Sequence, residues 1–318
     1  MTSRTRPLAT ALVAALVGLL ALVGCSAGTP APPGGPTSPS IAASAVNAAS
    51  FPRDVKIGDT TVHVAQQPNS IVILGPALTE TVYAIGAGEQ VKAVDKLSNY
   101  PAEAKKSDLD AFSPNVEAIA GMSPDLVLVS SDQGDIVKKL TALKIPVALL
   151  TAPVDLDGVY AQIEQIGELT GNDAKASEVA ATTKSRVEAA VALAQGTTAK
   201  TYYWEVDSTF FSITSETFAG TVLGQFGLTS IADKAPGADK SYGYPQLSAE
   251  FILDADPDVI FAPGGDAAAI RRRSGWDVVR AVKDEAGIIV LDNDLASRWG
   301  PRVADLAESI AAGLAKIK

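Results

Sequence analysis

The sequence predicts an α/β fold of two lobes, each built on a parallel sheet, joined by a single long helix. Glu117 and Glu250 each stand in a short helical pattern and are followed, seven residues later, by Pro-Asp and a run of apolar residues. Apolar runs of strand length alternate with helical patterns in both halves of the chain, as in parallel sheets covered by helices on both faces. Between the halves, residues 173–194 contain no Pro or Gly and are rich in Ala, Glu and Lys. That stretch predicts a helix of roughly 33 Å.

The composition argues against several classes of function. The chain has 318 residues, of which 47% are hydrophobic and 19% charged, enough for two modest domains with buried cores. The formal net charge of -10 excludes nucleic acid as an expected partner, because phosphate binding needs a basic face. A single Cys leaves no intrachain disulfide, and a single His argues against a histidine-built metal site.

The start of the chain predicts a lipid anchor followed by a tether. Two arginines precede an apolar stretch that ends in Leu22-Val23-Gly24-Cys25, a pattern that resembles the bacterial lipobox. Residues 1–24 are therefore expected to be a lipoprotein signal peptide, and the thiol of Cys25 is expected to accept a lipid. The alternative is a plain signal peptide with an incidental Cys. Diacylglycerol on Cys25 would give two-chain anchoring to a membrane, and residues 25–50, rich in Ser, Ala, Pro and Gly, are expected to be a flexible tether.

Residues 51–152 are expected to form the N-terminal lobe. Apolar runs predict its strands and amphipathic patterns predict its helices. Strands are expected around Val62 and Val64 and at residues 71–74, 91–94, 126–129 and 147–150. Helices are expected at residues 78–85, ended by Gly86 and Gly88, at the Glu117 unit and at 136–143.

Residues 153–198 show no strand pattern and predict a helical connector, with the long helix as its second part. The alternative for this helix is an ordinary surface helix, but the similar units on either side favour a strut between lobes. Residues 199–318 are expected to form the C-terminal lobe, and both lobes are expected to be Rossmann-like. The strands of the C-terminal lobe are expected at 201–206, 259–262 and 287–291. Its helices are expected at 218–226, at the Glu250 unit and at 303–317.

Enzyme signatures are missing from the sequence. Its one Gly-x-Ser-x-Gly match, Gly24–Gly28, lies at the expected end of the signal peptide and not at a strand-to-helix turn, and the sequence contains no Gly-x-x-x-x-Gly-Lys loop. Gly86-Ala87-Gly88 follows a helix where a dinucleotide-binding loop would follow a strand. His63 has no nucleophile near it in sequence and is expected to be a surface or edge residue. We therefore expect no enzymatic activity.

Several aromatic residues stand where loops leave predicted strands. In open parallel sheets, ligands bind at the loops that follow the carboxyl ends of the strands. Flat rings there would line a cleft for a large flat or apolar ligand; the alternative is that each ring packs against its own loop. The candidates are Tyr100, Phe112, Tyr242, Tyr244 and Trp299. Arg298 is a candidate to pair with a carboxylate, phosphate or amide of the ligand, and Arg302 is expected to be a structural partner of the last helix.

Glu117 and Glu250 are candidates for docking onto a basic partner. A glutamate on a helix is usually only solvated, and an isolated exposed ion pair contributes about 0–1 kcal/mol. Matched placement in two similar lobes is what favours docking over solvation.

These features together resemble the class III substrate-binding proteins of ABC importers, which serve cobalamin, siderophores and haem. The resemblance covers the chain from about residue 55 to its end. It implies that two lobes share a cleft for a small-molecule ligand, and that the permease and ATPase subunits of the importer are partners. It also implies that one glutamate from each lobe, here Glu117 and Glu250, docks onto permease arginines. A helical connector implies small closure on binding.

Two segments are similar to those of the cobalamin-binding members: Ser98–Pro101 and Tyr244–Ser248. Tyr100, Phe112 and Tyr244 fall on cobalamin-contacting aromatic positions, and two of them depart from the tryptophans expected there. The resemblance implies cobalamin or a related corrinoid as ligand, with an iron-siderophore or haem as the alternative. A cell-surface enzyme or adhesion module is the alternative from another class. We expect a lipid-anchored receptor on the extracytoplasmic face of the cell membrane, without a metal or cofactor apart from the transported ligand.

Overall fold

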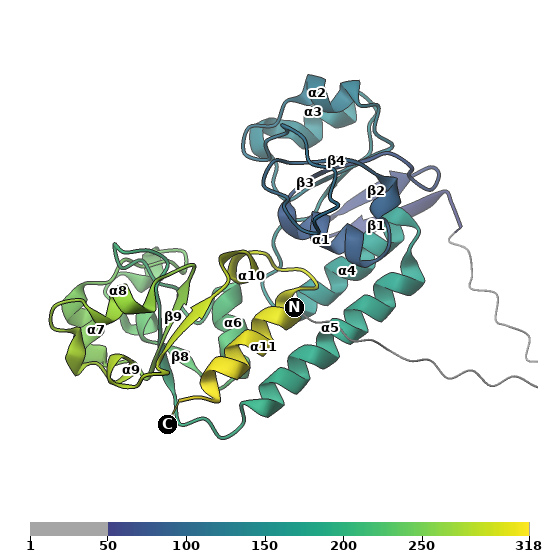
Figure 1. The fold of residues 1–318 in the computed structure, drawn as a ribbon. Coiled ribbons are helices and arrows are strands. Elements are labelled where there is room, and N and C mark those ends of the chain that lie inside the picture. The colour runs from purple at the N-terminus through teal and green to yellow at the C-terminus, as the bar shows by residue number, and fades with distance from the viewer. Residues whose placement is uncertain (1–49, 318) are drawn as a thin grey trace, which may run out of the picture. The chain divides into compact units, whose positions relative to one another are not determined.

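Two four-stranded parallel sheets dominate the structure (Figure 1), a computed structural model that describes residues 50–317. The first half contains β1 (Arg53–Ile57), β2 (Thr60–Val64), β3 (Ile71–Leu74), α1 (Pro76–Ala84), η1 (Gly88–Gln90), β4 (Val91–Val94), α2 (Val116–Gly121), β5 (Leu126–Val129), η2 (Gln133–Asp135), α3 (Ile136–Ala142) and β6 (Val147–Leu149). The connecting helices are α4 (Leu156–Thr170) and α5 (Asp173–Leu193). The second half contains β7 (Thr201–Trp204), α6 (Phe218–Gln225), β8 (Thr229–Ser230), η3 (Ile231–Lys234), η4 (Ala238–Lys240), α7 (Ala249–Ala255), β9 (Val259–Pro263), α8 (Ala267–Arg271), η5 (Trp276–Val278), α9 (Arg280–Lys283), β10 (Ile288–Leu291), α10 (Asn293–Ser297) and α11 (Val303–Leu314).

The two sheets have the same strand order. The first runs β4-β3-β5-β6 and the second, read from its other edge, β8-β7-β9-β10. In each sheet, the strand that comes first in sequence, β3 or β7, lies centrally beside the strand that follows the glutamate-bearing helix, α2 or α7. The repeat in the sequence therefore corresponds to a repeat in topology, and the predicted α/β fold with parallel sheets is confirmed.

Alternate residues of the central strands face different apolar clusters. Ile71 and Ile73 of β3 belong to a large core that also contains residues of α1, α4 and α11, whereas Val72 and Leu74 pack with α2 and α3. Tyr202 of β7 joins the same large core, while the next residue, Tyr203, packs with residues of α7, α8 and α9. Both sheets are thus covered on both faces, which explains their continuous apolar runs.

The long helix α5 packs beside α4 and α11 (Figure 1). The large core runs through this group of helices and includes strands of both sheets, so both halves share one continuous core. Arg186 of α5 adds ion pairs to Asp305 and Glu308 of α11 at 2.6 and 2.8 Å. Among residues 50–317, no helix combines the length and the apolar character that crossing a membrane requires. The division into domains at residues 152 and 198 stays a prediction.

Most boundaries expected from the sequence agree with the structure to within a few residues, but β1, β8, α8, α9 and α10 were not expected. Helix α1 begins at Pro76, two residues before the expected start at residue 78, because proline is well accommodated in the first turn of a helix. The last helix, α11, ends at Leu314, three residues before the expected end at residue 317. The edge strand β1 was not expected, because its burial alternates and its apolar residues are few.

The aspartate of each Pro-Asp pair ties the start of a central strand to its neighbour. Asp125 accepts a hydrogen bond from the backbone N–H of Asn69, just before β3, at 2.9 Å. Asp258 accepts from the backbone N–H groups of Lys200 and Thr201 and from the Thr201 hydroxyl at 2.8–3.0 Å. The repeated motif therefore has a structural role in both halves.

Replacing Asp258 with asparagine is expected to lower the free energy of unfolding at pH 7 by about 1.5–3 kcal/mol, the usual range for a hydrogen bond to a charged group. Burial raises the pKa of Asp258, but the hydrogen bonds from Lys200 and Thr201 outweigh it and hold the pKa below 3.8. A carboxylate with a lowered folded pKa stabilises the fold above its unfolded pKa and loses that contribution as the pH falls through the folded value.

The difference in the free energy of unfolding between D258N and the wild type should therefore become smaller below pH 3.8. Urea unfolding at pH 7 and at pH 3 measures this difference. D277N, which changes an exposed aspartate of η5, is the control and should match the wild type at both pH values. A midpoint for D258N equal to that of the wild type at pH 7 would contradict the assignment.

Candidate functional site

A pocket of about 810 Å³ lies at the carboxyl-end loops of the second sheet and beside the segment that follows β6. We call it the aromatic pocket. Its lining residues are Ala152, Pro153, Val154, Thr214, Ser215, Glu216, Thr217, Phe218, Asp233, Ala238, Asp239, Tyr242, Gly243, Tyr244 and Trp299. The volume falls within the range of small-molecule sites, about 300–1,000 Å³.

Trp299 forms an aromatic wall of this pocket. Its ring stacks on Phe218, with centroids 4.4 Å apart and planes 21° from parallel. Its indole Nε1 is buried and has no hydrogen-bond partner among the described residues. The ring system of Trp299 can pack against a flat ligand. Its Nε1–H can donate a hydrogen bond to a ligand carbonyl when a movement of the side chain exposes it.

Tyr242 and Tyr244 lie on a turn opposite the start of α6. Tyr242 and Gly243 both have positive φ, 53° and 86°, and the backbone N–H of Thr214 donates to the Gly243 carbonyl at 2.9 Å. A Cβ at position 243 would lie 2.7 Å from Thr217 Cγ2, so only glycine lets this turn approach α6 so closely. Tyr242 is 98% exposed and Tyr244 45% exposed. Both rings are therefore accessible to a ligand.

The segment before α6 is held in place by its own polar contacts. The backbone N–H and hydroxyl of Ser215 both donate to Asp233 at 2.7 Å. Thr217 caps α6 by accepting from the Gly220 N–H at 3.1 Å. These hydrogen bonds hold the polar lining residues Ser215, Thr217 and Asp233 in place beside the stacked rings of Trp299 and Phe218.

The charge of the aromatic pocket is entirely acidic. Its lining contains Glu216, Asp233 and Asp239, and none of the described lining residues is Lys, Arg or His. Anionic groups placed there would meet carboxylates without a compensating cation, whereas amide N–H groups would find acceptors.

Two of the five candidate rings lie outside this pocket. Tyr100, 46% exposed, lies under the guanidinium of Arg302, which is 4.1 Å from the ring centroid. Its loop is anchored by buried Asp95, which accepts from the Gly75 N–H, the Leu97 N–H and the Ser98 hydroxyl at 2.8 Å each. Phe112 is 73% exposed. The structure thus brings together Tyr242, Tyr244 and Trp299.

The guanidinium of Arg298 is bound by protein groups. It pairs with Asp294 at 2.8 Å and with Glu80 at 3.3 Å, and it donates to the side chain of Asn99. Arg302, expected to be a partner of the last helix, precedes α11 and pairs with Asp305 of that helix at 3.7 Å. It also pairs at 3.0 Å with Glu80 of α1, a long-range contact that the sequence did not predict.

Sequence reasoning also missed pocket residues that carry no chemical signature. Pro153 and Val154 lie in the loop that follows β6, so the carboxyl-end rule that singled out the tyrosines would have found them. Phe218 stands at the start of a predicted helix and was not singled out; it is buried, and its ring stacks on Trp299.

Glu117 and Glu250 occupy matching places at the second position of α2 and α7. Asn115 caps α2 by accepting from the Ala118 N–H at 3.0 Å, and Ser248 caps α7 by accepting from the Phe251 N–H at 3.1 Å. Both glutamates are exposed. Hydrogen bonds from its own backbone N–H and from the Ser248 side chain hold the pKa of Glu250 below 4.5.

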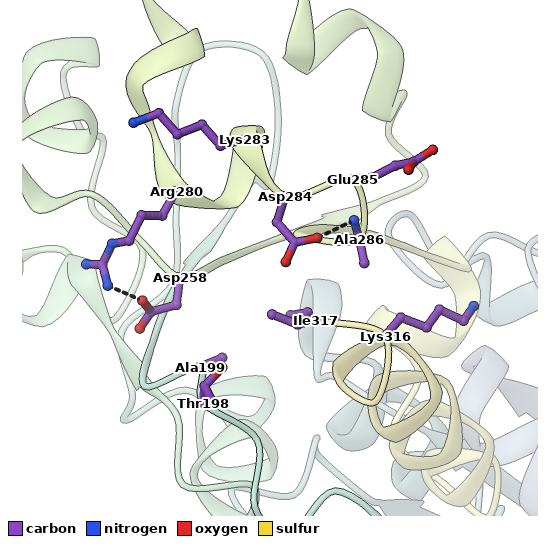
Figure 2. Close-up of a pocket in the computed structure, with 10 residues that line it drawn as sticks. All are labelled: Thr198, Ala199, Asp258, Arg280, Lys283, Asp284, Glu285, Ala286, Lys316 and Ile317. Atoms are coloured by element: carbon purple, nitrogen blue, oxygen red, sulfur yellow. Dashed lines mark hydrogen bonds and ion pairs between the residues drawn. The ribbon is translucent and has the colours of Figure 1, made fainter.

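A second pocket, of about 740 Å³, lies at the opposite end of the second sheet, where β7, β9 and β10 begin (Figure 2). Three of its charged residues bind one another or the backbone. Arg280 pairs with Asp258, and Asp284 accepts from the Ala286 N–H at 2.8 Å. Because no aromatic residue lines it, this pocket is a poorer match for a flat ligand than the aromatic pocket. In the part of the chain from residue 50 to 317, no group of three or more His, Cys, Asp or Glu residues could hold a metal ion.

Comparison with known proteins assigns the fold to a family. Residues 71–295 match the periplasmic binding protein family. The chain is 33% identical over 265 residues to the uncharacterized ABC transporter substrate-binding lipoprotein YvrC of Bacillus subtilis, covering 78% of this chain and 82% of YvrC. It is 31% identical over 285 residues to the cobalamin-binding protein of Halobacterium salinarum, covering 85% of this chain and 76% of the relative.

Solved structures have the same fold. A possible iron-binding (periplasmic solute-binding) protein from Staphylococcus epidermidis superposes with a TM-score of 0.67 at 25% identity, covering 78% of this chain and 99% of that one. The periplasmic vitamin B12 binding protein BtuF of Vibrio cholerae superposes with a TM-score of 0.64 at 23% identity, covering 78% and 97%. At 23% identity, the similarity to the Vibrio cholerae protein shows a common fold and nothing more. The chain therefore belongs to the periplasmic binding protein family, whose members bind substrates for transport and are not enzymes, as the sequence predicted.

Proposed function

We propose that this protein is the receptor of an ABC importer for cobalamin or a related corrinoid, and that the aromatic pocket is where the ligand binds. The observation that carries the choice of ligand is the combination of aromatic walls with an acidic lining. A corrin ring is flat enough to lie on Trp299, Tyr242 or Tyr244, and its rim carries neutral amides whose N–H groups can donate to Glu216 and Asp239. The relatives named as cobalamin-binding or vitamin B12-binding proteins support the same ligand.

The alternative ligands, haem and ferric siderophores, fit this lining less well. Haem carries two propionates, and many ferric siderophores are anionic, so both would place negative charge near three carboxylates with no nearby cation in the lining. Like charges in a shared site cost binding free energy. Solved structures of similar fold are titled as haem-binding or iron-binding proteins, so haem and ferric siderophores are the second candidates.

The remaining parts of the proposal concern the membrane. Glu117 and Glu250, exposed on matching helices, would engage arginines of the permease. Cys25, outside the described residues, would carry the lipid that holds the receptor on the extracytoplasmic face of the membrane. The name of the YvrC relative, an ABC transporter lipoprotein, supports this arrangement.

Incubation with cyanocobalamin, haemin and a ferric siderophore, each followed by desalting, is expected to leave corrinoid absorbance on the protein. Isothermal titration then gives the Kd for each ligand. A protein that retains haemin or the siderophore and no corrinoid would overturn the choice of ligand. A protein that turns over a substrate in the absence of any permease would overturn the receptor role.

A further inference from the structure

Glu80 of α1 holds two arginines that lie more than 200 residues further along the chain. Arg298 and Arg302 pair with the same oxygen, Glu80 Oε1, at 3.3 and 3.0 Å. The side chain of Glu80 is 1% exposed, and those of Arg298 and Arg302 are 12% and 19% exposed. A glutamate of the N-terminal lobe thus binds both ends of a five-residue segment, Arg298–Arg302, from the C-terminal lobe.

The burial of these charges makes them depend on one another. A buried charge is costly unless it is paired, and removing one partner leaves the other uncompensated. The second oxygen, Glu80 Oε2, has no hydrogen-bond partner among the described residues. Burial raises the pKa of Glu80 despite the two guanidiniums. The contacts to Arg298 and Arg302 act against this rise by stabilising the charged form of the carboxylate.

Gly300, in the middle of the segment, lies directly on α1. A Cβ at this position would be 3.0 Å from Thr81 Oγ1 and 3.2 Å from the Ala77 carbonyl oxygen. The absence of a side chain lets the segment approach the helix that carries Glu80. The ion pairs and this close approach fix the same segment from two directions.

Trp299 stands between these contacts and faces the other way. While Arg298, Gly300 and Arg302 touch α1, the ring of Trp299 stacks on Phe218 of α6 and lines the aromatic pocket. The residues on both sides of Trp299 are therefore in contact with α1.

We infer that Glu80 is a positioning residue for ligand binding: through Arg298 and Arg302 it holds Trp299 in the orientation that the ligand meets. This inference rests on the proposed function, because it takes the aromatic pocket as the ligand site. Glu80 does not line that pocket and acts through the two arginines.

The inference can be tested in the whole protein labelled with 5-fluorotryptophan. The sequence contains three tryptophans, so the ¹⁹F spectrum has three signals, and the signal of Trp299 is identified by its loss in W299F. E80Q is expected to shift or broaden the Trp299 signal and to leave those of Trp204 and Trp276 in place. The Kd for cyanocobalamin is expected to rise at least about 5-fold, the lower end of typical coupling between sites.

E205Q is the matched control. Glu205 is also buried and binds a single arginine, Arg273, whose guanidinium lies 4.7 Å from the Trp276 ring centroid. Neither residue lines the aromatic pocket. E205Q should therefore shift the Trp276 signal, leave the Trp299 signal in place, and change the Kd by less than the E80Q substitution does.

G300A provides a second variant that keeps every charge. It should move the Trp299 signal and weaken binding in the same direction as E80Q. An unchanged Trp299 signal in E80Q and in G300A would overturn the inference, as would a Kd shift no larger than that of E205Q. If E80Q moves the Trp299 signal but the wild type binds no corrinoid, the positioning role stands and the proposed ligand fails.

Discussion

Replacing Trp299 with alanine is expected to raise the Kd for cobalamin roughly 30-fold or more, which corresponds to about 2 kcal/mol and is typical of a buried aromatic anchor. The substitution removes the ring that lines the aromatic pocket and the stacking partner of Phe218. Among the aromatic residues of the pocket, Trp299 has the largest ring system and is stacked on Phe218, whereas Tyr242 is almost fully exposed. Isothermal titration of the wild type and W299A gives the ratio directly.

Two further variants separate lost contact from lost stability. W299F keeps a ring on Phe218 and should fall between the wild type and W299A. W276F changes the buried tryptophan that stacks on Phe210 outside the pocket, with ring centroids 5.9 Å apart. It should lower the unfolding midpoint and leave the Kd unchanged. Unaltered cobalamin affinity in W299A would place the ligand elsewhere.

The double variant E117A/E250A is expected to abolish uptake while leaving the Kd for the ligand unchanged. Close charge pairs that are desolvated at an interface couple by about 1.5–7 kcal/mol each. Even at the lower limit, each glutamate would contribute roughly tenfold to docking. The two sites lie on separate helices, α2 and α7, so their effects should add. Accumulation of labelled cobalamin in cells that depend on this receptor measures the result.

E89A/E285A is the matched control for uptake. It also removes one exposed glutamate from each half of the chain and changes the net charge by the same amount. Both double variants should fractionate with membranes through Cys25, which is checked in the same cells. Equal uptake by E117A/E250A and the wild type would contradict the docking role, and a large loss of ligand affinity would show that the glutamates serve the pocket instead.

The positions of most helices and strands could be predicted because each depends on residues close together in sequence. The continuous apolar runs of β3 and β7, the uninterrupted pattern of α5 and the repeated Pro-Asp units are all local signals. Edge strand β1 was missed because its few apolar residues alternate with exposed ones. The family resemblance followed from the same local motifs.

The candidate site could be predicted only in part. The carboxyl-end rule singled out Tyr242, Tyr244 and Trp299, which share a pocket, and also Tyr100 and Phe112, which do not line it. The carboxyl-end rule predicts which loops lie at the same end of a parallel sheet. It does not predict which aromatic side chains on those loops line the same pocket. Glu80 gave no signal, because a glutamate in a helical pattern is usually solvated.

The sequence by itself determined the order of elements, the two similar halves and the matched exposed glutamates, because these depend on hydrophobic period and on motifs of a few residues. Only the tertiary structure decided that Arg298 and Arg302 converge on Glu80 and that Trp299 stacks on Phe218. Those contacts join residues about 80 to 220 positions apart, and their geometry is set by how the sheets and helices pack around a shared core. Such pairings have no local pattern from which they could be read.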